Sequence, residues 1–241
     1  MRPCILAHRG LSGLYPENTL LAFEKAVQAG CDGIETDVQL SADGEPVIIH
    51  DDTLERTTTG SGPVRSQTFK ELRNLDAGLW FGEQFTGQKI PHLSEVLALA
   101  HNSGLKLNIE LKYGDVYYEG LEETVLRLVL GMDMADEVML SSFDHSSMMK
   151  CKQIDARVNT GLLYKWPVYR AEKYAALCGA DALYPNHISV RLDPGLPARA
   201  HQRGIAVYAW TVDTRSNAKK MSEMGVDGLI TNFPEQISNN L

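Results

Sequence analysis

Two carboxylates stand as next-but-one neighbours within one short stretch of this sequence, residues 31–40, which reads CDGIETDVQL. In an extended chain alternate side chains share one face, so Glu35 and Asp37 project together from the same side. Two buried acids at this spacing repel each other, and one of them takes up a proton unless a cation lies between them. We therefore expect a cation site here if the strand is buried on both faces. The alternative is a half-solvated antiparallel strand whose acids face water.

Further polar side chains follow other predicted strands. They are His8 and Arg9 after residues 5–7, His50 and Asp51 after residues 47–49, and Asn108, Glu110 and Lys112 along one face of residues 107–112. Taken singly, each has an ordinary structural interpretation as a rim residue or a salt-bridge partner. In an α/β barrel, however, polar residues at the carboxyl ends of the strands converge on one active site. We therefore expect the two histidines, three of these acids and the two cations to meet there.

The acids of this set favour a hard metal ion. Carboxylates offer only oxygen ligands, which suit a hard divalent cation such as Mg²⁺ or Ca²⁺. Clustered cysteines and a His-x-x-x-His pattern are absent from the sequence, which argues against zinc. The pattern therefore predicts a site for a single hard cation.

The remaining polar residues favour phosphoryl transfer. Histidines titrate near neutral pH, so His8 and His50 on either side of a bound ester could pass a proton in and out. Arg9 and Lys112 would hold an anionic group against the cation. The sequence contains no Gly-x-Ser-x-Gly elbow, and no cysteine lies in a reactive setting, so acyl transfer is less favoured.

The elements that must position these residues follow a repeated order of helix, glycine and short strand. We predict helices at 18–29, 93–102, 169–178, 197–203 and 216–224, and strands at 5–8, 34–38, 47–50, 105–111, 138–141, 158–163, 182–184, 205–210 and 228–231. A glycine after a helix supplies the left-handed residue that ends it, and short connections favour parallel strands with crossover helices. The pattern predicts an α/β fold, a TIM-type (β/α)₈ barrel. A doubly wound open sheet competes, but no Gly-x-Gly-x-x-Gly turn follows the first strand.

The regular order is interrupted twice. Strands 34–38 and 47–50 are separated by only the turn 42–45, and residues 52–91 break the repeat altogether. This segment contains a capping-box pattern at 68–71 and the aromatic residues Trp80, Phe81 and Phe85. We expect one domain, residues 1–241, with a small cap insertion at about 52–91 over the barrel mouth. The alternative is a loop that packs its aromatic residues on the outside.

Composition limits the partners. The chain has 241 residues, 44% of them apolar, and a formal charge of -8, so neither nucleic acid nor an anionic membrane surface is an expected partner. The four cysteines are scattered and are expected to be unpaired in a reducing compartment. No apolar run matches a signal peptide or a membrane span, so we expect a cytoplasmic protein without a stable membrane anchor.

A series of motifs runs in order along nearly the whole chain. They are HRG at 8–10, PENT at 16–19, ETDV at 35–38, HD at 50–51 with TTTG at 57–60, ELK at 110–112, WTV at 210–212 and DGLITNFP at 227–234. The series resembles that of the glycerophosphodiester phosphodiesterases, and is closest in length to their cytosolic bacterial type. The resemblance implies a TIM-type barrel with a small cap after His50. It also implies a divalent metal held by Glu35, Asp37 and Glu110.

The resemblance further implies hydrolysis of glycerophosphodiesters to sn-glycerol 3-phosphate and an alcohol. His8 and His50 are then the acid-base pair, Arg9 lies beside the phosphate, and Lys112 adds positive charge there. Trp210 is either a wall for the glycerol or a barrel filler. Which histidine is the acid stays open, as does the choice between attack by the glycerol 2-hydroxyl, through a cyclic phosphate, and direct attack by water.

Two other functions compete. A lysophospholipase D acting on lysophospholipids would need an apolar path to the mouth, which the cap aromatics could provide. A metal- and phosphate-binding module without turnover is disfavoured because the acid-base residues are complete. Among the supporting residues, Asn18 is expected to cap the first helix, and Asp51 to orient His50 or a loop. The oligomeric state is open, and a homo-oligomer is one possibility.

Overall fold

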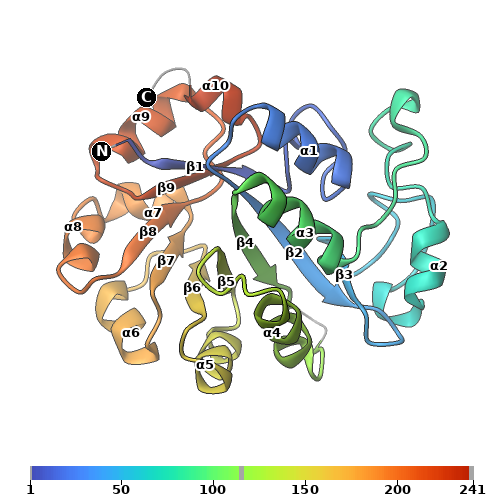
Figure 1. Ribbon diagram of the computed structural model, residues 1–241. Helices are drawn as coiled ribbons and strands as arrows, with labels where there is room; N and C mark the ends of the chain where they lie inside the picture. The colour runs from blue at the N-terminus through green and yellow to red at the C-terminus, as the bar shows by residue number, and fades with distance from the viewer. Residues whose placement is uncertain (1, 114–116, 239–241) are drawn as a thin grey trace.

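The computed structural model describes residues 2–113 and 117–238. Within these residues eight parallel strands form a closed ring: β1 (Cys4–His8), β2 (Gly33–Leu40), β4 (Lys106–Leu111), β5 (Val138–Ser142), β6 (Asn159–Tyr164), β7 (Ala182–Pro185), β8 (Ala206–Ala209) and β9 (Gly228–Thr231). The ring closes because β1 pairs with β2 on one side and with β9 on the other (Figure 1). The predicted TIM-type barrel is therefore confirmed, and the open sheet is excluded.

Helices surround this ring (Figure 1). In the described part of the chain the α-helices outside the insertion are α1 (Leu20–Gln28), α3 (Leu93–Ser103), α4 (Leu121–Gly131), α5 (His145–Ile154), α6 (Ala171–Cys178), α7 (His187–Leu192), α8 (Leu196–His201), α9 (Arg215–Glu223) and α10 (Pro234–Ser238). Gly104 and Gly179 end α3 and α6 in the left-handed conformation, as predicted. The prediction missed α4, α5, α7 and α10. The C-caps of α4 and α5 are Met132 and Asp155 rather than a left-handed glycine.

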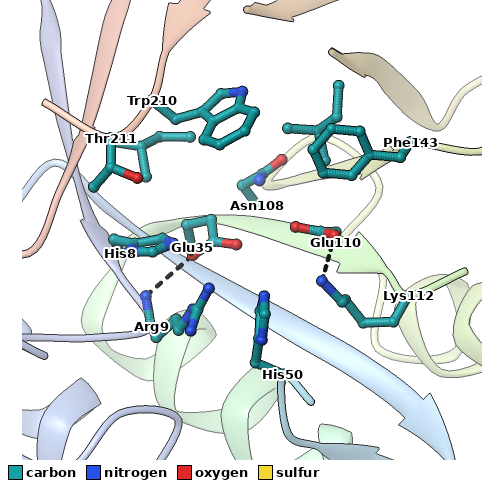
Figure 2. Close-up of a pocket in the computed structure, with 12 residues that line it drawn as sticks. His8, Arg9, Glu35, His50, Asn108, Glu110, Lys112, Phe143, Trp210 and Thr211 are labelled. Atoms are coloured by element: carbon teal, nitrogen blue, oxygen red, sulfur yellow. Dashed lines mark hydrogen bonds and ion pairs between the residues drawn. The ribbon is translucent and has the colours of Figure 1, made fainter. Parts of the chain in front are cut away.

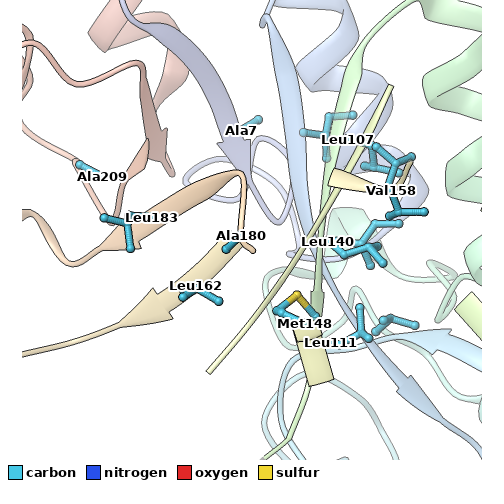
Figure 3. Packing of buried hydrophobic residues seen from close by; sticks show 14 of the residues in the cluster. Ala7, Leu107, Leu111, Leu140, Met148, Val158, Leu162, Ala180, Leu183 and Ala209 are labelled. Atoms are coloured by element: carbon cyan, nitrogen blue, oxygen red, sulfur yellow. The ribbon is translucent and has the colours of Figure 1, made fainter. Parts of the chain in front are cut away.

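Two apolar layers hold the barrel together. The outward faces of the strands pack against the helices through residues such as Leu107, Leu140 and Leu183 (Figure 3). Inside the ring, the rings of Tyr184 and Tyr208 stack with centroids 5.0 Å apart. A Cβ atom on Gly161 would lie 2.3 Å from the Tyr184 ring, and one on Gly228 would lie 2.2 Å from the Tyr208 ring. The two glycines therefore make room for the aromatic filling.

The strand that precedes His50 lies outside the ring. β3 (Pro46–Ile48) pairs antiparallel with the carboxyl-terminal end of β2, where Ile48 lies opposite Val38. It therefore runs back toward the barrel, and the amide of Ile49 donates to the carbonyl of Asp37 at 3.2 Å. The expectation that His50 follows a barrel strand is wrong. The histidine reaches the mouth because an antiparallel strand returns to it.

The insertion at 52–91 has an apolar cluster of its own. It contains η1 (Val64–Ser66), α2 (Phe69–Asn74) and η2 (Glu83–Phe85), and it lies beside β2 and β3 in Figure 1. Its buried apolar side chains include Leu54, Val64, Leu72 and Ile90, which pack against β3. The predicted capping box at Thr68 is present at the start of α2.

The aromatic residues of the insertion pack edge to face against one another. Phe81 meets Trp80 and Phe85 edge to face, with centroids 5.4 and 5.5 Å apart, and Phe85 meets Tyr15 of the β1–α1 loop at 5.7 Å. The insertion therefore packs against a loop at the edge of the barrel mouth. None of the helices placed by the structure combines the length and the apolar character needed to cross a bilayer.

Candidate active site

A pocket of about 100 Å³ opens at the carboxyl ends of the barrel strands. It is lined by His8, Arg9, Glu35, His50, Asn108, Glu110, Lys112, Phe143, Leu163, Trp210, Thr211 and Ile230. In Figure 2, Trp210 and Thr211 lie on one side, Arg9 and His50 on the other, with Glu35 between them. Seven of the eight residues predicted for the site line this pocket. The eighth, Asp37, is only 1% exposed and lies behind it.

Three carboxylates from two neighbouring strands gather in this region. Glu35 and Asp37 come from β2 and Glu110 from β4, and the strand register sets Asp37 opposite Glu110. One oxygen of each carboxylate lies within 4.8 Å of an oxygen of the other two. All three are buried. The structure therefore brings together the acids that the sequence placed in one cluster.

Burial of these acids makes the cluster electrostatically strained. Burial raises the pKa of Glu35 well above its usual value, and the neighbouring Asp37 and Glu110 raise it further. Burial likewise raises the pKa of Glu110, against the opposing effect of Lys112. For Asp37, Arg9 and Lys112 together outweigh burial and hold the pKa below its usual value. A divalent cation would relieve this repulsion between like charges.

The donor set fits a hard cation. Oδ1 of Asp37 is buried and has no hydrogen-bond partner among the residues that the structure describes. A buried carboxylate oxygen without a partner is costly, and coordination to a cation would satisfy it. Three carboxylates and no sulfur ligand make an all-oxygen site, as Mg²⁺ and Ca²⁺ prefer.

Two positively charged side chains flank the acids. Nζ of Lys112 lies 2.8 Å from Oε1 of Glu110 and 3.6 Å from Oδ1 of Asp37. Nε of Arg9 lies 3.3 Å from Oδ2 of Asp37, and the backbone amide of Arg9 donates to Oε2 of Glu35 at 3.0 Å. Both side chains also line the pocket, where they can meet an anionic group.

His8 is held in one tautomer by an amide. Its Nδ1 lies 2.7 Å from Oδ1 of Asn232, and Nδ2 of Asn232 donates to Asp213 at 2.7 Å. Because Asp213 fixes the amide nitrogen, Asn232 presents an acceptor, so Nδ1 of His8 carries the hydrogen. Nε2 is then a proton acceptor, 3.8 Å from Oε2 of Glu35. Burial, with help from Arg9, lowers the pKa of His8 to about 4, which keeps the ring neutral at neutral pH.

Asn232 and Asp213 were not predicted as site residues. Asp213 directly follows the WTV motif at 210–212, and Asn232 belongs to the closing DGLITNFP motif. The motif is the signal that could have indicated them. Contact with His8 depends on how the loops after β8 and β9 fold toward β1, which the sequence alone does not show.

His50 is held by a carboxylate. Its Nδ1 lies 2.6 Å from Oδ1 of Asp51, and hydrogen bonds from Arg56 keep the pKa of Asp51 at about 2. Asp51 is therefore an ionised acceptor, and Nδ1 of His50 donates to it. The expectation that Asp51 orients His50 is confirmed.

A buried glutamine fixes the backbone on both sides of His50. Nε2 of Gln39 donates to the carbonyls of Ile49, His50 and Asp51 at 3.0, 3.1 and 2.8 Å. Its Oε1 accepts a hydrogen bond from the hydroxyl of Tyr118 at 2.7 Å. Gln39 therefore ties the segment after β3 to the barrel strand β2.

Asn18 has a different role from the expected one. The N-cap of α1 is Thr19, whose side chain accepts from the amide of Ala22. Asn18 instead donates through Nδ2 to Oδ2 of Asp37 at 2.8 Å and accepts from the Thr36 hydroxyl at 2.8 Å. It therefore orients an acid of the cluster, and the prediction that it caps the helix is wrong.

The aromatic wall of the pocket comes from two loops. Trp210 meets Phe143 edge to face, with centroids 5.6 Å apart, and its indole nitrogen donates to the carbonyl of Tyr184 at 2.7 Å. Trp210 is thus a wall of the pocket, while Phe143 was not predicted. Trp80, Phe81 and Phe85 of the insertion are not among the pocket-lining residues that the structure describes.

Comparison with known proteins agrees with this geometry. A model of the Glycerophosphoryl diester phosphodiesterase family matches residues 8–236. The chain belongs to this family. It is 39% identical to a glycerophosphodiester phosphodiesterase of Caldanaerobacter subterraneus subsp. tengcongensis, over 99% of this chain and 98% of the relative. The phosphodiesterase resemblance found in the sequence is confirmed.

Solved structures of other phosphodiesterases have the same barrel. An Oleispira antarctica phosphodiesterase in complex with the product sn-glycerol-3-phosphate has a TM-score of 0.90 and 30% identity, over 99% of this chain and 96% of that one. A glycerophosphodiester phosphodiesterase from Agrobacterium tumefaciens has a TM-score of 0.86 and 28% identity, over 98% and 99% of the two chains. The chain is therefore an enzyme of the phosphoric diester hydrolase class.

Proposed function

We propose that this chain hydrolyses glycerophosphodiesters to sn-glycerol 3-phosphate and an alcohol, with His8 and His50 as the acid-base pair and one divalent cation, Mg²⁺ or Ca²⁺. The observation that carries this proposal is the pair of histidines at one acid cluster, each with Nδ1 held by a different kind of acceptor. The product bound to the Oleispira relative supports the same substrate class.

Binding is assigned to the groups that line the pocket. Glu35, Asp37 and Glu110 would hold the cation, which when bound withdraws electron density from a phosphoryl oxygen and neutralises developing negative charge. Arg9 and Lys112 bind the remaining phosphate oxygens. Trp210 covers the apolar edge of the glycerol, opposite these charged groups (Figure 2).

Proton transfer is assigned by the partner of each histidine. His8 is neutral with a free Nε2, so it takes the proton of the attacking hydroxyl as that oxygen bonds to phosphorus. His50 donates the Nε2 proton to the alcohol oxygen as its bond to phosphorus breaks, while Nδ1 keeps its hydrogen bond to Asp51. The attacking oxygen belongs to the glycerol 2-hydroxyl or to water, and His8 serves either route.

A leaving-group comparison tests the two roles. On glycerophosphocholine, His8→Ala and His50→Ala each lower kcat by about 10²- to 10⁴-fold, because each loses one proton-transfer step. A diester with a p-nitrophenyl leaving group needs no protonation of that group. It therefore restores turnover to His50→Ala and leaves His8→Ala slow.

The controls are a distant histidine and a chelator. His101 lies in the last turn of α3, 3.3 Å from Glu137, and is not among the described residues that line the pocket, so His101→Ala keeps its activity. Chelation stops the wild type, and Mg²⁺ or Ca²⁺ restores it. Near-normal turnover of glycerophosphocholine by His50→Ala would contradict the role of His50. Full activity of the wild type in the presence of chelator would contradict the metal requirement. Lysophosphatidylcholine as a second substrate distinguishes a lysophospholipase D from the proposed enzyme.

A further inference from the structure

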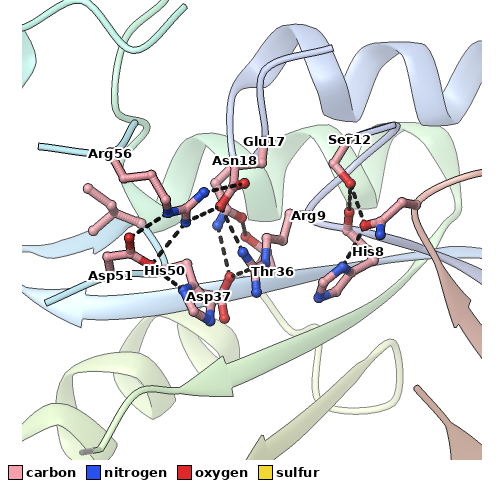
Figure 4. A network of polar contacts seen from close by, with 12 residues as sticks. His8, Arg9, Ser12, Glu17, Asn18, Thr36, Asp37, His50, Asp51 and Arg56 are labelled. Carbon is pink, nitrogen blue, oxygen red and sulfur yellow. Dashed lines mark hydrogen bonds and ion pairs between the residues drawn. The ribbon is translucent and has the colours of Figure 1, made fainter. Parts of the chain in front are cut away.

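A guanidinium group of the insertion joins two loops of the active site. Arg56 donates to Asp51 (Nε to Oδ2 2.5 Å, Nη2 to Oδ1 3.0 Å) and to Glu17 (Nη1 to Oε2 2.9 Å, Nη2 to Oε1 2.8 Å). Asp51 holds His50, and Oε1 of Glu17 also accepts from Nη1 of Arg9 at 2.8 Å. The side chains of these five residues form one continuous chain of contacts (Figure 4).

Arg56 acts on the site through other residues. It is not among the described residues that line the pocket, and its side chain is 43% exposed. Its planar fork of donors meets two carboxylates at once, which the point charge of a lysine cannot do. These contacts restrict the rotation of both carboxylates, and so fix the acceptor that His50 uses and the acceptor that Arg9 uses.

We propose that Arg56 is a positioning residue for the hydrolysis. By clamping Asp51 to Glu17 it keeps the His50 imidazole and the Arg9 guanidinium in a fixed relation, so the proton donor and the phosphate-binding group meet one substrate together. The inference rests on the proposed roles of His50 and Arg9. It also gives the insertion a part in catalysis, since Trp80 packs against this guanidinium with 6.0 Å between the ring centroid and Cζ.

A second arginine of the insertion provides a matched control. Arg73 binds both oxygens of Glu95 in α3 at 2.7 Å, and so ties the same insertion to the barrel without contacting a site residue. Arg56→Lys and Arg56→Met are expected to lower kcat on glycerophosphocholine by about 10- to 100-fold, since small misplacements of reacting groups are costly. Arg73→Met lowers the melting temperature and leaves kcat unchanged.

Product affinity and a double-mutant cycle separate positioning from general loosening. The Kd of sn-glycerol 3-phosphate, measured by calorimetry with the same metal, should rise far less than kcat falls in Arg56→Lys. Arg56→Met should cost less in the Asp51→Asn background than in the wild type, because the part of its effect that passes through Asp51 to His50 is already lost there.

Three results would overturn the inference. They are wild-type kcat in Arg56→Lys, equal kcat losses in Arg56→Met and Arg73→Met, and additive losses in the cycle. A wild-type protein that leaves glycerophosphodiesters intact would instead overturn the proposed function. The two failures are therefore distinguishable.

Discussion

At the scale of single residues, the partner of Nδ1 sets the work that each histidine can do. Asn232 gives His8 a neutral acceptor, while burial and Arg9 disfavour the charged ring, so this imidazole is suited to accept a proton. Asp51 gives His50 an ionised acceptor, which suits the proposed role of this imidazole as the proton donor. The two histidines differ through these neighbours rather than through their own type.

Asn232→Leu tests this difference. The substitution removes the acceptor for Nδ1 of His8, so the ring is free to take the other tautomer or to turn. We expect kcat on glycerophosphocholine to fall by about 10- to 100-fold, as for other residues that orient a reacting imidazole, with a smaller change in KM. The measurement is steady-state kinetics at fixed metal concentration.

Ser12→Ala is the control for Asn232→Leu. The Ser12 hydroxyl lies 2.8 Å from Oδ1 of Asn232 and 2.6 Å from the carbonyl of His8. Its removal takes away these two contacts but leaves both partners of the contact between Nδ1 of His8 and Oδ1 of Asn232 in place. Its kcat should stay near that of the wild type. Equal losses in the two variants would show that the whole loop, and not the Nδ1 partner, is what matters.

At the scale of elements, the position of His50 depends on an antiparallel strand and on one buried amide. β3 is only three residues long, so its pairing with β2 does not by itself hold the segment that follows. Gln39 compensates, because it binds three successive carbonyls of that segment from inside β2. A strand that ends outside the barrel is thereby tied to the barrel.

Gln39→Leu should loosen this tie. Three carbonyls lose a donor, which costs about 1–3 kcal/mol of folding free energy for each carbonyl that stays buried, and kcat should fall because His50 is no longer fixed. Chemical denaturation and kinetics on the same preparation measure the two effects. Tyr118→Phe is the control, since it removes only the hydrogen bond to Oε1 of Gln39. If Tyr118→Phe lost as much kcat as Gln39→Leu, the three carbonyl contacts would not be the cause.

The sequence predicted those parts of the site that depend on local periodicity. Alternation along β2 and β4 places Glu35, Asp37 and Glu110 on one side, and the repeated helix and strand order predicts the barrel. It did not predict that β3 runs antiparallel. The sequence also misassigned Asn18. An asparagine that caps a helix and one that donates a hydrogen bond to a carboxylate on a distant strand cannot be told apart from the sequence alone.

At the scale of the whole molecule, the shifted pKa values of the acid cluster make the stability of the fold depend on pH. Glu35 has a pKa raised above its usual value of 4.5, so the folded state holds a proton there that the unfolded chain has lost. The stability contributed by this group is present at low pH and is lost as pH rises from about 4.5 through the raised pKa. Asp37 has a lowered pKa and the opposite sign, but its contribution is lost only below its usual 3.8.

Melting temperatures measured with and without metal test this balance. At pH 7, a divalent cation at about 100 times its Kd adds about 2.7 kcal/mol to the wild type, or about 5–10 °C for a chain of this length. Glu35→Gln removes one of the crowded charges. Without metal, the difference in melting temperature between Glu35→Gln and the wild type should therefore shift in favour of Glu35→Gln as the pH is raised from 5 to 8. The increase in melting temperature that metal causes should be smaller in Glu35→Gln than in the wild type. Glu223→Gln, at an exposed acid of α9, controls for net charge. An equal metal response in Glu35→Gln and wild type would contradict the cluster as the cation site, because a cation held elsewhere on the barrel would stabilise both proteins alike.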